Sequence, residues 1–111
     1  MVYQDSTHLH GPLALAQAPN GDLLSAQGDA INPDPNQASE IVEFTPAGKF
    51  VAELSLSSTQ GGAFGLAISS TGNTTTLDVV NDITNTLEVF TIKNTRHAGH
   101  AVAVGGGTTS Y

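Results

Sequence analysis

The chain has 111 residues, of which 39% are hydrophobic and 12% are charged, and this length suits one small domain. Ten acidic residues against three basic ones give a formal net charge of −7, which argues against nucleic acid and anionic membrane surfaces as partners, because both are bound through basic patches. No cysteine is present, which excludes disulfides and thiolate chemistry.

The opening residues, Met1 to His10, carry neither the basic nor the apolar region of a signal peptide. No later apolar run approaches the ~20 residues of a membrane-spanning helix, so we expect no membrane insertion. These features predict either a cytosolic protein or a piece of a longer chain.

The stretch GPLALAQAPNGDLLSA, from Gly11 to Ala26, could form a helix of Leu and Ala or two strands around a turn. Prolines bound the Leu/Ala run at both ends, and Asn20-Gly21 favours a tight turn because both residues tolerate positive φ. The stretch therefore predicts a strand, a turn and a second strand. The polar segment that follows, Gly28–Ser39, is rich in Pro, Asn and Asp and predicts a long loop.

Four further apolar runs predict strands, and no stretch has the pattern of a capped amphipathic helix. In KFVAELSLS, alternate residues from Phe50 to Leu56 are apolar, which is the period of a half-buried strand. The other three runs are rich in β-branched and aromatic residues and cover Glu40–Thr45, Thr75–Val80 and Thr86–Ile92. Turns are expected at Thr45–Lys49 and Ser69–Asn73.

The predicted strands recur in the same order along the chain. Aligning GPLALAQAPNGD with GAFGLAISSTGN places Gly11 on Gly62, and aligning EIVEFT with TLEVFT places Phe44 on Phe90. A repeated unit of ~40–50 residues with four strands is typical of a β-propeller blade.

The order of motifs in GPLALAQAPNGDLLSAQG…ASEIVEFTPAGKFVAEL resembles the NHL repeat of β-propellers. The turns Asn20–Asp22 and Thr45–Lys49 are the most specific part of this resemblance, and the second unit matches at FGLAIS and NTLEVFTI. The chain also looks like the closing blades of bacterial exported propellers of this type, which favours an extracellular or periplasmic location. The resemblance covers Gly11 to Ile92 and implies an all-β fold of two four-stranded antiparallel blades.

We expect the blades at residues 11–58 and 59–104, with the outer strand of the second blade at His100–Gly106 and a flexible tail at residues 105–111. Residues 1–10 are either a leading segment or the outer strand of a preceding blade. Two blades alone leave apolar faces open, so a ring of ~4–8 blades has to be completed. Either a longer chain supplies further blades, or identical chains assemble, for example as a trimer forming a six-bladed ring.

Three residues are candidate metal ligands: Asp29, Asn81 and Asp82. Their oxygens are the ligands that Ca²⁺ prefers. The family resemblance adds that lactonase-like propellers hold a channel Ca²⁺ through Asp, Asn and Glu at strand ends, which is where Asn81 and Asp82 fall. Asp29 is their expected counterpart in the first blade. The alternative is that all three cap turns.

The histidines form two pairs, His8 with His10 and His97 with His100. Histidines two apart on a strand point to one face and could share a metal ion. Both pairs lie outside the predicted blade cores and have no cysteine beside them, so we expect surface or tail polar residues rather than a metal pair. No nucleophile elbow, P-loop or dinucleotide motif is present, and no catalytic residue is assigned.

The sequence thus favours a non-catalytic binding or scaffold segment of an NHL-type propeller that recognises a protein, a glycan or another small ligand through its loops and channel. The alternative is part of a Ca²⁺-dependent lactonase-like hydrolase or of a lyase. A third possibility is a truncated or artificial chain without an activity of its own.

Overall fold

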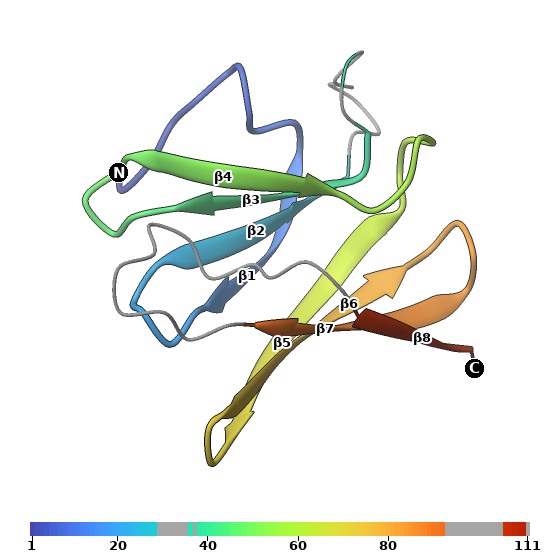
Figure 1. The fold of residues 1–111 in the computed structure, drawn as a ribbon. Coiled ribbons are helices and arrows are strands. Elements are labelled where there is room, and N and C mark those ends of the chain that lie inside the picture. Colours follow the sequence, from blue (N-terminus) through green and yellow to red (C-terminus); the bar gives the residue numbers. More distant parts are fainter. Residues whose placement is uncertain (29–35, 37, 93–105, 111) are drawn as a thin grey trace.

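The structure, a computed structural model, describes residues 1–28, 36, 38–92 and 106–110. These residues form two antiparallel sheets and contain no helix, so the expected all-β class is confirmed (Figure 1). It follows that the described residues include no helix able to cross a membrane.

Each sheet has its strands in chain order, every strand pairing with the next. The first sheet consists of β1 (Pro12–Gln17), β2 (Leu23–Gln27), β3 (Glu40–Phe44) and β4 (Phe50–Ser55). The second sheet consists of β5 (Ala63–Thr71), β6 (Thr74–Asn81), β7 (Thr86–Ile92) and β8 (Gly106–Ser110).

The opening ambiguity resolves as two strands, because β1 and β2 flank a turn in which Gly21 has a φ of +93°. The apolar runs after it also form strands as predicted, although β5 continues to Thr71 and leaves a shorter turn than expected. The last strand differs from the prediction: β8 at Gly106–Ser110 pairs with β7, where a tail was expected. The apolar run before it lies mostly outside the described residues. Which segment pairs with β7 at this edge depends on the register between the two strands, and the composition of the segment does not predict that register.

The two sheets repeat each other in register as well as in strand order. Leu23 pairs with Phe44 in the first sheet, and Leu77 pairs with Phe90 in the second. Near the start of β1 and of β5 the register shifts, and there the carbonyl of Gly11 accepts a 2.8 Å bond from the amide of Gly28. The carbonyl of Gly62 accepts the equivalent 2.9 Å bond from Asp82. The sequence repeat is therefore a repeat of backbone pairing.

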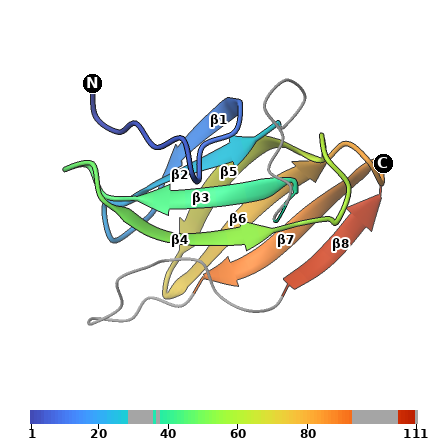
Figure 2. The ribbon, with the colours of Figure 1, turned by 90° about the horizontal axis from the view of Figure 1, so that it is seen from above.

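We call the face of each sheet that carries the paired Leu and Phe its front face, and the opposite face its back face. The front face of the first sheet bears Leu23 and Phe44, whereas Leu24 and Ile41 lie on its back face. Figure 2 shows the sheets as successive layers. The main core lies between the back face of the first sheet and the front face of the second; its fully enclosed side chains include Leu24, Ile41, Leu77 and Val79.

A buried serine ties the start of β3 to the second sheet. Ser39 has a φ of +51°, and its hydroxyl accepts a 2.7 Å bond from the amide of Gly62 while donating to the carbonyl of Thr59 at 2.5 Å. A Cβ at Gly62 would lie 2.8 Å from that hydroxyl oxygen. The glycine that begins the second repeat is thus required by this close approach.

Candidate functional site

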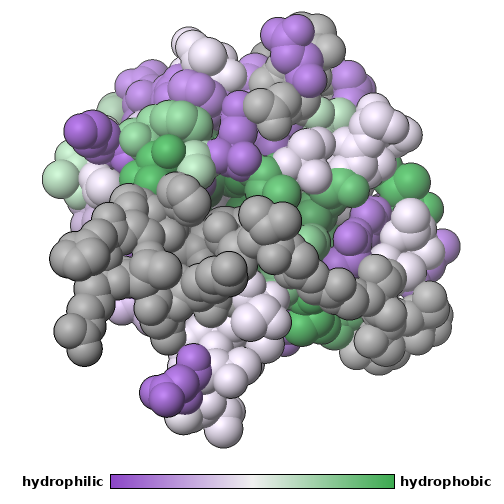
Figure 3. Space-filling view, viewed as in Figure 1, coloured by the Kyte–Doolittle hydropathy of each residue, from purple (hydrophilic) through white to green (hydrophobic). Residues whose placement is uncertain are grey.

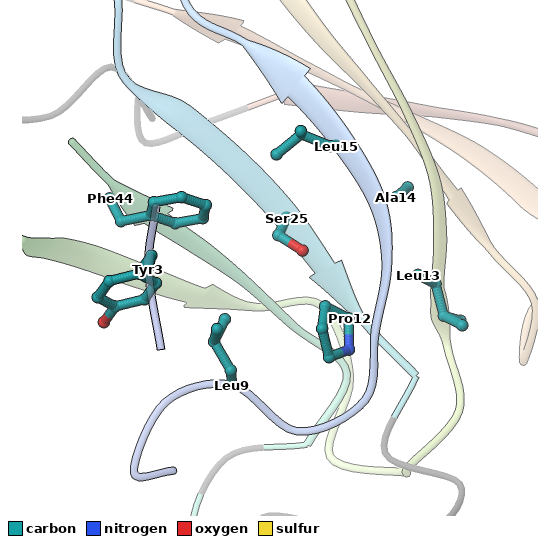
Figure 4. Close-up of a pocket in the computed structure, with 8 residues that line it drawn as sticks. All are labelled: Tyr3, Leu9, Pro12, Leu13, Ala14, Leu15, Ser25 and Phe44. Carbon is teal, nitrogen blue, oxygen red and sulfur yellow. The ribbon is translucent and has the colours of Figure 1, made fainter. Parts of the chain in front are cut away.

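An apolar depression lies on the front face of the first sheet, beside the N-terminal residues (Figure 4). This front hollow has a volume of about 300 Å³. Its lining is mainly apolar and consists of Tyr3, Leu9, Pro12, Leu13, Ala14, Leu15, Ser25 and Phe44. Its size falls in the range of small-molecule sites.

Strand pairing and the N-terminal residues together shape this hollow. Leu15 pairs with Ser25, so both side chains project from the front face. Leu15 is 63% exposed because β1 is the edge strand of the sheet. On the other side, the ring of Tyr3 stacks on Phe44 with centroids 4.5 Å apart and an angle of 14°. Ser25 contributes a hydroxyl to this mainly apolar lining.

Residues 1–10 pack over the front face and do not form a strand. His8 stacks on Phe50 with ring centroids 3.8 Å apart, and the amide of His10 donates a 2.8 Å bond to Oε1 of the buried Gln27. Together with the Tyr3–Phe44 stack, these contacts attach the segment at three separate points. We call residues Met1–His10 the cap segment.

Asp5 organises the cap segment from within. Its carboxylate accepts bonds from the hydroxyl of Tyr3, from the amides of Thr7 at 2.8 Å and His8 at 3.2 Å, and contacts Nδ1 of His8 at 2.5 Å. Burial raises the pKa of Asp5, but these hydrogen bonds outweigh it and hold that pKa well below its usual range. The carboxylate is therefore charged at neutral pH.

Tyr3 is held in its neutral form by the same arrangement. Burial raises the pKa of its hydroxyl, and the nearby carboxylates of Asp5 and Glu53 raise it further. Tyr3 therefore acts as a hydrogen-bond donor, and Asp5 orients both the tyrosine hydroxyl and the His8 ring. The side-chain bonds described for His8 go to Asp5, so the geometry supports a positioning role in the fold of the cap segment.

Two of the three expected metal ligands, Asn81 and Asp82, lie at the end of β6 in the second sheet. Asp29 lies outside the described residues. Asn81 ends β6 and is buried, and its Oδ1 accepts from the amides of Ile83 at 3.1 Å and Thr84 at 3.4 Å. Its Nδ2 donates a 2.6 Å bond to Oε2 of Glu88. Asn81 thus has the geometry of the turn-capping alternative.

Asp82 follows Asn81 and is exposed at a second hollow of about 280 Å³. This hollow is lined by Val80, Asn81, Asp82, Asn85, Thr86 and Leu87. The described residues contain no cluster of three or more His, Asp or Glu side chains that could hold a metal ion. Backbone bonding makes Gly28, rather than Asp29, the counterpart of Asp82 in the first sheet. The Ca²⁺ site stays a prediction.

His8 and His10 do not point to one face as a metal pair would, and His10 is buried rather than at the surface. His8 bonds Asp5, whereas Nε2 of the buried His10 lies 2.9 Å from the carbonyl of Thr7. The two-residue spacing places side chains on one face only within a strand, and this segment turns instead. His97 and His100 lie outside the described residues.

Sequence reasoning missed Tyr3, Asp5 and the front hollow. Asp5 followed by Thr7 is a turn signal, since a short acidic side chain often accepts the amide two residues on. The stacking of Tyr3 on Phe44 joins distant parts of the chain and has no local signal.

Comparisons of this chain with family models, curated proteins and solved structures give no match.

Proposed function

We propose that this chain is a non-catalytic binding segment of an NHL-type β-propeller, built from two consecutive blades. The observation that carries the proposal is the repeated register of the two sheets, stacked with the back face of one on the front face of the next. Successive blades of a propeller stack in this repeating manner around an axis.

The edge strands that contact each other also support this assignment. The principal contacts between the sheets are made by β1 and β2 with β5. β1 and β5 are the first strands of their repeats, and in a propeller the first strands lie next to the axis. On this arrangement, the exposed Leu13 and Leu15 of β1 would face the channel, beside the front hollow.

We assign the front hollow as the binding site for an uncharged small molecule with an aromatic or alkyl group. Its apolar lining favours such a group, and the Ser25 hydroxyl can bond a polar substituent. The net charge of −7 disfavours anionic ligands. An aryl glycoside combines these properties and serves as a probe.

A titration of the ¹⁵N-labelled chain with phenyl β-glucoside tests this site by NMR. We expect saturable shifts of the amides of Leu9, Ser25 and Phe44, and loss of these shifts in Leu15→Asp. Phe64→Asp is the matched control, since Phe64 is 41% exposed and lies outside the hollow. Shifts confined to other residues, or equal binding by Leu15→Asp, would contradict the assignment.

The Ca²⁺-dependent hydrolase alternative has its own test. A ligand that binds only the folded chain raises the melting temperature, and the rise grows with the logarithm of the ligand concentration divided by the dissociation constant. The binding proposal predicts no shift when Ca²⁺ is added. A rise of several degrees that Asp82→Asn abolishes would favour the alternative.

A further inference from the structure

The surface between the two sheets provides a template for contacts between chains. There, the back face of the first sheet, with Leu24 and Ile41, packs on the front face of the second, with Leu77 and Val79. The two surfaces are different, so the contact is front to back. A front-to-back contact can be repeated by further copies, because each copy binds one neighbour through its front face and another through its back face.

The same two kinds of face occur at the outer sides of the sheet pair. By the repeated register, Leu23 and Phe44 on the front of the first sheet correspond to Leu77 and Phe90. On the back of the second sheet, the Val80–Leu87 pair corresponds to the Ala26–Ile41 pair of the first sheet. The back face of the second sheet in one copy could therefore pack on the front face of the first sheet in another copy, and this would repeat the front-to-back contact found within one chain.

Among the residues that the structure describes, these two outer faces differ in what covers them. The front face of the first sheet carries the cap segment, through Tyr3 on Phe44, His8 on Phe50 and the backbone of His10 on Gln27. The back face of the second sheet leaves Val80 42% exposed. In Figure 3, apolar surface is visible where Figure 1 places β6 and β7, whereas the surface toward the β5–β6 turn is neutral to hydrophilic.

We propose that the cap segment occupies the place of a neighbouring sheet, and that its release lets the front face bind the back face of the second sheet of another copy. This inference rests on the proposed function, because it treats the sheets as equivalent blades. The cap segment prevents the head-to-tail assembly that the repeated faces would otherwise allow.

Competition between the two occupants favours the capped chain in dilute solution. A short tether gives the cap segment an effective concentration in the millimolar range, well above a micromolar second copy. Asp78 also lies on the back face of the second sheet, where its counterpart in the first is Leu24, so this face is less apolar than the one it would copy. We therefore expect the wild-type chain to be monomeric at micromolar concentration.

Sedimentation velocity of full-length variants tests the proposal. Tyr3→Ala removes the stack on Phe44 and weakens the cap segment. We expect it to self-associate with a dissociation constant at least about tenfold below that of wild type, a factor that corresponds to ~1.4 kcal/mol. Adding Val80→Asp should restore the monomer, because it places a charge on the back face. Asn73→Asp, the same charge in an exposed turn, should not restore it.

A mixing experiment tests the front-to-back geometry. The double variant Tyr3→Ala/Val80→Asp offers only a front face, and wild type offers only a back face. Each should be monomeric alone, and together they should form a one-to-one complex. A wild-type dimer that Val80→Asp dissociates would indicate back-to-back pairing and overturn the proposal.

Amide hydrogen exchange separates failure of this inference from failure of the proposed function. If β6 amides are protected in Tyr3→Ala and this variant stays monomeric, the two sheets are intact and only the cap proposal is overturned. If β6 amides exchange freely in wild type, the stacked sheets are not formed and both proposals are overturned. Association that Val80→Asp does not reverse also overturns the cap proposal.

Discussion

Two glycines in matched turns allow the packing of the cap segment to be measured. Gly21 and Gly48 have φ values of +93° and +89°, and each amide bonds the carbonyl three residues earlier at 2.9 Å. A Cβ at Gly21 would meet no atom within 4 Å, whereas a Cβ at Gly48 would lie 2.3 Å from the carbonyl oxygen of Val2. Alanine therefore introduces the same backbone strain at both sites but displaces the cap segment only at Gly48.

The expected losses of stability follow from these contacts. Left-handed backbone costs a non-glycine residue ~1–2 kcal/mol, so Gly21→Ala should lower the free energy of unfolding by about that amount. Gly48→Ala should lose the same amount and, in addition, the Tyr3–Phe44 stack, which is worth ~0.5–1.5 kcal/mol beyond its buried area. We therefore expect Gly48→Ala to be less stable than Gly21→Ala by ~1–2 kcal/mol, the stack together with part of the buried area.

Urea unfolding at low micromolar concentration measures both variants. In a Tyr3→Ala background, where the cap segment is already weakened, the two glycine substitutions should cost nearly the same, because their difference arises from a shared contact. Equal losses in the wild-type background would refute the reasoning, since they would mean that Val2 does not pack against the turn at Gly48.

Two further predictions concern the core between the sheets and the charge on Asp5. Leu77→Ala should lower the free energy of unfolding by ~2–5 kcal/mol because Leu77 is fully buried. Val80→Ala should lower it much less, because Val80 is 42% exposed. Similar losses for the two variants in urea unfolding would contradict the placement of Leu77 in the core between the sheets. The lowered pKa of Asp5 stabilises the fold above the ordinary carboxyl pKa of ~3.9, and this contribution is lost as pH falls below it. The stability of wild type should therefore fall more steeply below about pH 4 than that of Asp5→Asn, and parallel pH profiles would contradict the Asp5 arrangement.

Local signals in the sequence were sufficient for most of the two sheets. Asn20-Gly21 and the bounding prolines predict the β1–β2 turn, and the sequence repeat aligns Phe44 with Phe90, which hold equivalent register positions in the two sheets. Such features depend on backbone preferences and on alternation, which neighbouring residues determine.

The rest depends on contacts between distant residues. The cap segment packs through Tyr3 on Phe44 and His10 on Gln27, and neither pair is visible in a local pattern. The front hollow is lined in part by Tyr3 and Leu9 of that segment, so it depends on the same distant contacts. The strand Gly106–Ser110 pairs with β7, although its glycines have a low strand propensity. Its composition therefore did not predict this edge strand.

The central claim is that the two sheets are equivalent units stacked back to front. Methyl–methyl NOEs in an Ile/Leu/Val-labelled sample test it most directly. The account predicts cross-peaks from the Leu24 and Ile41 methyl groups to those of Leu77 and Val79, and none from Leu24 or Ile41 to Val80. Cross-peaks confined within each sheet, or joining Ile41 to Val80 instead of Leu77 and Val79, would contradict it.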